Sequence, residues 1–158
     1  METIVIGSTR AGLTLKKDLI KYLENKGFKV DDVGMKSEDE FIPYHKAAMN
    51  VAEGISSGKY QRGIIICGTG AGSVIAAAKF KGVYPVHVTN TFMAEKAKAV
   101  NNCNCLVFGE WLTPANHAYA MLDSWMNTCF GDGNTDEWKA FLANCVNEIG
   151  EYENQHIR

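Results

Sequence analysis

The chain has 158 residues, a length that fits one domain with a hydrophobic core large enough to need no disulfide or metal. Its 16 basic and 18 acidic residues leave a formal charge of -2 and form no basic patch, so we expect a small-molecule partner and no nucleic acid. It shows no basic leader, no apolar run near the ~20 residues that cross a bilayer, and an odd number of cysteines, so we expect a cytoplasmic protein without a membrane partner.

Short β-branched runs alternate with amphipathic segments along the chain, which is the pattern of a parallel sheet wrapped by helices. Strands are expected over residues 3–6, 28–33, 63–67, 83–88 and 105–108. Helices are expected from about residue 11 to near 27, over 44–57, 73–80 and 91–100, from 114 onward, and over about 137–152. The third strand is apolar throughout and therefore belongs in the middle of the sheet. The sequence predicts an α/β domain of five βα units.

A glycine-rich turn, Gly68-Thr69-Gly70-Ala71-Gly72, follows that central strand. Ligands of open parallel sheets bind outside the carboxyl ends of the strands. Without Cβ atoms this backbone can approach an anion closely, and the following helix N-terminus favours negative charge, so a phosphate or an enediolate oxygen would fit. The alternative is a merely tight connection between strand and helix. The chain lacks a P-loop and an acidic residue for a dinucleotide ribose, so we expect a sugar phosphate and no cofactor.

Cys67 ends the strand immediately before these N–H groups. A thiol beside a helix N-terminus is available as a base or nucleophile, although free cysteines are also common as buried apolar residues. Cys103 and Cys105 are spaced by one residue and have no second pair at ligand spacing, so no metal site is expected. The four histidines, His45, His87, His117 and His156, are expected to be structural or solvent-facing, with the alternative that His45, near the second loop, lines the cleft.

Three segments resemble the type B ribose-5-phosphate isomerases, a family that includes the galactose-6-phosphate isomerase subunits. Residues 67–79 (CGTGAGSVIAAAK) resemble the family's active-site segment, residues 4–12 its first strand and loop, and residues 101–109 its fifth-strand signature. The resemblance implies a three-layer α/β/α, Rossmann-like fold with a five-stranded parallel sheet, forming one domain over residues 1–158. It also implies a homodimer or a dimer of dimers with shared active sites, in which the last helix packs on the domain or on the dimer partner.

The same resemblance implies an aldose–ketose isomerase that works through a cis-enediolate. Cys67 would take the C2 proton of an open-chain aldose and deliver it to C1, while Thr69 and the turn's N–H groups hold the oxygens. Asn101 would reach the enediolate from across the dimer, although asparagine also suits a helix end. The other expected substrate contacts are Ser8, Thr9, Arg10, Gly68, Gly70, Gly72, Ser73 and Asn90. For Asn90 the alternative is a helix cap, and for Arg10 it is a solvated position in a loop.

The chain departs from the family's pattern at both ends of the expected substrate. An Asp-His pair in the first loop is replaced by Thr9-Arg10, and the histidine that opens the sugar ring aligns with Val100. The places of the phosphate-gripping arginines hold other residues, namely Trp111, Asn134 and either Glu137 or Trp138. Arg10 is the nearest replacement, because its planar guanidinium can bind phosphate or carboxylate in two places.

Three hypotheses accommodate these losses. A tetrose 4-phosphate cannot close a five-membered ring, because its O4 is esterified, and this substrate would explain Val100. Alternatively, the chain is one subunit of a galactose-6-phosphate isomerase type assembly and a partner chain supplies the missing groups. The third hypothesis is a non-catalytic protein that binds a sugar phosphate.

Overall fold

The computed structural model describes residues 2–157, which build a five-stranded, all-parallel sheet in the order β2-β1-β3-β5-β4. The strands are β1 Thr3–Ser8, β2 Lys29–Asp32, β3 Gly63–Cys67, β4 Pro85–His87 and β5 Cys105–Gly109. Every strand expected from the sequence is present, and the all-apolar β3 lies at the centre. The edge strand β4 is shorter than predicted.

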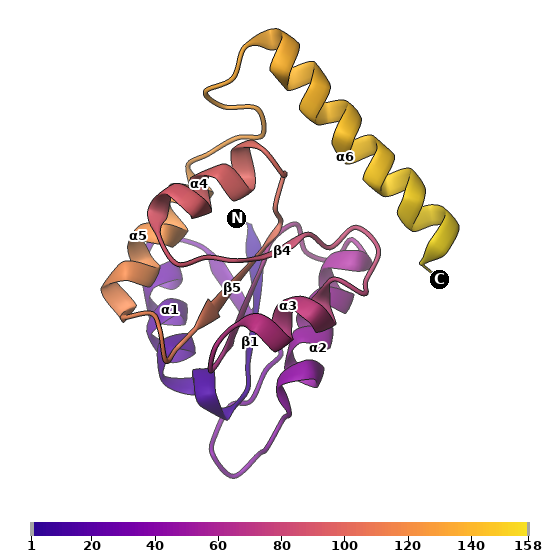
Figure 1. The fold of residues 1–158 in the computed structure, drawn as a ribbon. Helices are drawn as coiled ribbons and strands as arrows, with labels where there is room; N and C mark the ends of the chain where they lie inside the picture. Colours follow the sequence, from indigo (N-terminus) through magenta and orange to yellow (C-terminus); the bar gives the residue numbers. More distant parts are fainter. Residues whose placement is uncertain (1, 158) are drawn as a thin grey trace.

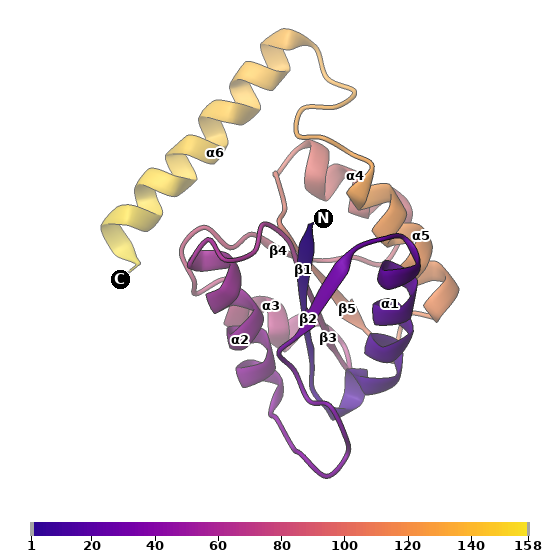
Figure 2. The same ribbon diagram turned by 180° about the vertical axis from the view of Figure 1, so that it is seen from behind.

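Helices cover both faces of the sheet and give three layers (Figures 1 and 2). They are α1 Leu13–Asn25, α2 Tyr44–Ser56, α3 Ala71–Ala77, α4 Thr91–Ala99, α5 Ala115–Met126 and α6 Asp136–His156. The core on one face is shared with α1, α4 and α5, and the core on the other with α2 and α3. The predicted α/β/α class is confirmed. The first helix begins later than expected, because residues 10–12 form a 3-10 turn before it.

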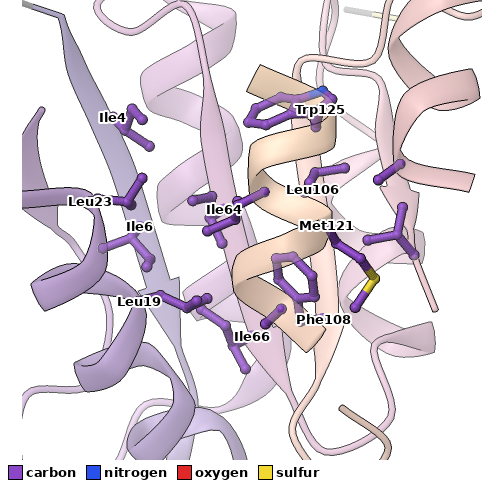
Figure 3. Close-up of a cluster of buried hydrophobic side chains, with 14 of the residues drawn as sticks. Ile4, Ile6, Leu19, Leu23, Ile64, Ile66, Leu106, Phe108, Met121 and Trp125 are labelled. Carbon is purple, nitrogen blue, oxygen red and sulfur yellow. The ribbon is translucent and has the colours of Figure 1, made fainter. Parts of the chain in front are cut away.

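The two cores follow from the alternation of side chains along the strands. Ile4 and Ile6 of β1 face the α1 and α5 layer, whereas Val5 faces α2. The larger core, shown in Figure 3, is closed by Trp125 of α5, whose side chain is 1% exposed. Its indole N–H donates to the Cys103 carbonyl at 3.1 Å, so the one polar atom of the ring is satisfied.

The last helix, α6, stands apart from the layered part of the molecule (Figures 1 and 2). Thr135 caps its first turn by accepting a hydrogen bond from the Trp138 N–H at 3.3 Å. Near its far end Glu153 accepts a hydrogen bond from the Gly82 N–H at 2.9 Å, which ties the helix to the segment between α3 and β4. Large apolar side chains remain at least half exposed along the helix, namely Trp138, Phe141, Ile149 and Tyr152.

None of the helices in residues 2–157 is both long and apolar enough to cross a bilayer.

Candidate active site

A cavity of about 310 Å³ opens at the carboxyl ends of β1 and β3. The chain leaves β1 towards β2 on one side of the sheet and reaches β3 on the other, so the cavity lies at the topological switch point where open α/β sheets bind ligands. Its wall is formed by the loop after β1, the end of the loop before α2, the glycine turn and Trp111 in the loop after β5. The lining residues are Thr9, Ala11, Phe41, Pro43, Tyr44, Cys67, Gly68, Thr69, Gly72 and Trp111.

Cys67 lies at the base of this wall as the last residue of β3 and is 5% exposed. Its Sγ accepts a hydrogen bond from the Gly70 N–H at 3.0 Å. A backbone donor aimed at the sulfur interacts more strongly with a thiolate than with a thiol, because hydrogen bonds to charged acceptors are the stronger ones. The thiol therefore sits at the cavity with a donor already in place.

Two aromatic rings explain why the turn needs glycine at its first and last positions. A Cβ on Gly68 would lie 2.9 Å from the ring of Trp111, and a Cβ on Gly72 would lie 2.6 Å from the ring of Tyr44. Both rings line the cavity and both remain largely exposed, Trp111 at 72% and Tyr44 at 49%. Glycine at these two positions therefore lets the rings of Trp111 and Tyr44 pack directly against the backbone of the turn.

Gly70 is a glycine for a different reason. Its φ of +88° is in the left-handed region, and a Cβ there would lie 2.5 Å from Cδ2 of His87. Burial lowers the pKa of His87 below its usual 6.5, which keeps this ring neutral at neutral pH. His87 was expected to be structural or solvent-facing, and its ring packs behind Gly70, the residue whose N–H donates to Cys67.

The turn also offers donors to a bound anion. The N–H groups of Thr69, Gly72 and Ser73 have no hydrogen-bond partner within residues 2–157. Donors of this kind hold a developing oxyanion without having to reorganise. Side-chain oxygens are limited to the hydroxyls of Thr9, Thr69 and Tyr44, and the lining contains no Asp, Glu, His, Lys or Arg.

The structure brings together some of the predicted substrate residues. Thr9, Gly68, Thr69 and Gly72 line the cavity with Cys67. The hydroxyls of Ser8 and Ser73 are buried, line no part of this cavity and have no partner among the described residues.

Three other predicted residues lie elsewhere. Arg10 is exposed, and its Nη2 donates to the Glu38 carbonyl at 2.9 Å. Asn90 caps α4 by accepting from the Met93 N–H at 2.8 Å, which is the alternative foreseen for it, and it lines a separate hollow beside α5. Asn101 follows α4 and precedes β5, so it lies at the amino-terminal edge of the sheet, opposite Cys67. Within one chain Asn101 does not reach the cavity.

Phe41, Pro43 and Tyr44 are wall residues that sequence reasoning missed. They belong to the loop after β2 and the start of α2, and they reach the cavity because β2 lies beside β1. The available signal was Pro43, since a proline just before a helix marks its start and so places Tyr44 at the carboxyl edge of the sheet. His45, proposed to line the cleft, is not among the lining residues, although its ring packs edge-on against Tyr44.

Comparison with known proteins shows the family of this chain. The sequence profile described as Ribose/Galactose Isomerase matches residues 4–140. The chain belongs to the ribose/galactose isomerase family. It is an aldose–ketose isomerase, a divergent member that resembles the type B ribose-5-phosphate isomerases.

Relatives and solved structures agree with this membership. A 4-deoxy-4-sulfo-D-erythrose isomerase from Clostridium sp. (strain MSTE9) is 35% identical, covering 98% of this chain and 98% of the relative. A D-erythrulose-4-phosphate isomerase from Pectobacterium atrosepticum is 32% identical, covering 98% of this chain and 97% of the relative. The structure of ribose-5-phosphate isomerase B from Clostridium thermocellum superposes with a TM-score of 0.87 at 34% identity, covering 98% of this chain and 99% of the other.

Proposed function

We propose that this isomerase acts on an open-chain four-carbon sugar that carries an anionic group at C4, with Cys67 as the base. The observation that carries the proposal is the composition of the cavity wall. It contains one buried thiol with a backbone donor, and no carboxylate, imidazole, lysine or arginine among its lining residues. Such a wall can move a proton between C2 and C1, but it offers no acid–base pair to open a sugar ring.

The four-carbon substrate follows from ring chemistry. A five-membered sugar ring needs a free hydroxyl on C4, and neither a C4 phosphate ester nor a C4 sulfonate leaves one. Two relatives are named for sugars of this kind, 4-deoxy-4-sulfo-D-erythrose and D-erythrulose 4-phosphate. Val100, which cannot exchange a proton, and the wall without acid–base groups are both consistent with a substrate that never closes its ring.

In the proposed reaction the Cys67 thiolate removes the C2 proton of the aldose and returns it to C1, while the hydroxyl proton on O2 passes to O1 in the cis-enediolate. The negative charge that develops on the oxygens of the cis-enediolate is held by the free N–H groups of Thr69 and Gly72 and by the Thr69 hydroxyl. The Gly70 N–H keeps its hydrogen bond to the sulfur throughout. The net change is an aldose converted to its ketose without a cofactor.

Arg10 is our candidate for the C4 anion. It follows Thr9, which lines the cavity, and its guanidinium bonds to the Glu38 carbonyl and forms no salt bridge within residues 2–157. If the guanidinium of Arg10 bound the anionic group of the substrate instead of the Glu38 carbonyl, its hydrogen bonds would be stronger, because both partners would then be charged. Arg10→Gln is expected to raise KM at least tenfold for the anionic sugar and to change kcat much less, whereas equal KM values would remove Arg10 from the site.

A second copy of the chain is proposed to complete the site. Asn101 lies at the edge of the sheet opposite Cys67, so it can meet an enediolate only from another subunit. The exposed apolar side chains of α6 supply a surface that a partner would cover. The cysteines are all free, which is consistent with assembly and action in the reducing cytoplasm. Mixing inactive Cys67→Ser and Asn101→Ala chains should restore part of the activity, and no restoration would contradict shared sites.

The decisive experiment is a substrate panel on the isolated chain. It comprises D-erythrose 4-phosphate, 4-deoxy-4-sulfo-D-erythrose, ribose 5-phosphate, a hexose 6-phosphate and the unphosphorylated sugars. We expect turnover of the C4-substituted tetroses, and the ratio of their kcat/KM values tells phosphate from sulfonate. Preference for ribose 5-phosphate would refute the ring argument, and binding without turnover would favour a non-catalytic protein or a subunit that needs a different partner.

Cys67→Ser tests the base. We expect kcat and deuterium exchange at C2 to fall by roughly 10³-fold, in the range of general acid–base contributions. The matched control is Cys129→Ser, because Cys129 is an exposed free thiol and should leave both rates unchanged. Exchange at the wild-type rate in Cys67→Ser would refute the assignment.

A further inference from the structure

The ring of His87 is the feature that the proposed reaction does not yet use. His87 ends β4, and its Nε2 is buried without a hydrogen-bond partner among the described residues. A neutral imidazole has one donor and one acceptor nitrogen, so this atom has hydrogen-bonding capacity that the free protein leaves unused. Unsatisfied buried polar atoms cost free energy and are uncommon in folded proteins, and those that persist call for an explanation.

The position of the ring points to the catalytic turn. A Cβ placed on Gly70 would lie 2.5 Å from Cδ2 and 2.9 Å from Nε2 of His87, so the ring edge that carries Nε2 rests on Gly70. Gly70 in turn donates its N–H to Cys67 Sγ at 3.0 Å. One residue therefore separates the unpartnered nitrogen from the sulfur.

The contacts that support the turn come from β5 and from His87 of β4. Gly70 has a φ of +88°, and glycine adopts this conformation at no steric cost but also leaves it easily. On the β5 side the backbone of Thr69 packs directly on Gly109, where a Cβ would lie 2.7 Å from the Thr69 carbonyl carbon. The ring of His87 supplies the matching contact from the β4 side.

We propose that His87 is a positioning residue for the proton transfer, holding Gly70 so that its N–H stays aimed at Cys67 Sγ. Its unpartnered Nε2 lies where it can serve as a polar partner for the backbone of the turn. His87 touches neither substrate nor sulfur. The inference rests on the proposed role of Cys67 as the base.

Two substitutions separate packing from hydrogen bonding. His87→Leu keeps an apolar side chain of similar size and removes both nitrogens, whereas His87→Gln places an amide near the position of Nε2. We expect His87→Leu to lower kcat at least tenfold with KM within twofold, and His87→Gln to stay within threefold of wild-type kcat. The matched control is Val86→Ala, because Val86 lies on the same strand and packs against the opposite core.

A second readout does not depend on turnover. The rate at which iodoacetamide alkylates Cys67, followed by mass spectrometry of the peptide that contains it, reports the state of the sulfur in the free protein. We expect this rate to fall several-fold in His87→Leu and to stay unchanged in Val86→Ala. Wild-type kcat and alkylation in His87→Leu would overturn the proposal, as would equal losses in His87→Leu and Val86→Ala. Should His87→Leu not fold, a tenfold loss of kcat in folded His87→Gln would likewise overturn the role of the polar atom.

The two proposals fail differently. If Cys67 were not the base, Cys67→Ser would keep its activity while His87→Leu still slowed alkylation. If His87 had no positioning role, Cys67→Ser would be inactive while His87→Leu behaved as wild type.

Discussion

Replacing Gly70 with alanine should destabilise the protein by about 3 kcal/mol. Alanine in the left-handed region costs about 1–2 kcal/mol, and forcing an extra carbon against a packed group adds about 1–3 kcal/mol. Both contributions apply at Gly70, where φ is +88° and the new Cβ would lie 2.5 Å from the His87 ring. The free energy of unfolding is measured by urea denaturation, and kcat is measured on the same samples.

Gly27 is the matched control for this experiment. Its φ is +87°, but a Cβ there would meet no heavy atom within 4 Å, so Gly27→Ala carries the backbone cost alone, about 1–2 kcal/mol. The difference between the two variants isolates the contact with His87, and the double variant Gly70→Ala with His87→Ala should recover much of it. Equal destabilisation by Gly70→Ala and Gly27→Ala would refute the reasoning, as would a double variant that recovers nothing.

Three further predictions concern the frame around the site. Lys16→Met should lower the free energy of unfolding, measured by urea denaturation, by about 3 kcal/mol. The 1%-exposed Lys16 binds both carboxylate oxygens of Asp32 at 2.6 and 2.9 Å, so its removal leaves a largely buried carboxylate unpaired. A loss below about 1 kcal/mol would contradict this. Hydrogen bonds from Arg62 lower the pKa of Glu2 below 4.5, so this pair stabilises the fold above that pH, and its contribution, about 1 kcal/mol or less, is lost as the pH falls further. The loss of stability in Arg62→Met should therefore be larger at pH 7 than near pH 2, and a loss that does not change with pH would contradict this. Thr135→Ala removes the cap of α6, and amide exchange in the first turn of that helix should accelerate about fivefold, as about 1 kcal/mol implies; unchanged exchange would show that the cap is not needed.

The strands and the glycine turn could be predicted because their signals are local in sequence. The apolar run of β3 is understandable only at the centre of a parallel sheet, and the structure places it there. Cys67 and Thr69 follow from the same segment, since a strand end and the turn after it share one edge of the sheet. Features that depend only on residues close together in the sequence could therefore be predicted from the sequence.

The aromatic walls and His87 depend instead on neighbours that are distant in sequence. Tyr44 reaches the cavity because β2 pairs with β1, and His87 meets Gly70 because the turn crosses the end of β5 at Gly109. The periodicity of apolar residues along the chain does not indicate which distant segments meet in this way. The amphipathic pattern of α6 likewise predicted a helix, but a pattern states only that a face needs covering and not what covers it.

The hydrogen bond between Glu153 and the Gly82 N–H has a practical consequence. It joins the end of α6 to the same short connection that leads from the helix after the glycine turn to His87. Glu153 is only 8% exposed, so this junction is enclosed by protein. We therefore expect an affinity tag or an immobilising linker attached beyond Glu153 to load the connection between α3 and β4, and a rate measured on such a fusion should be compared with that of the untagged enzyme.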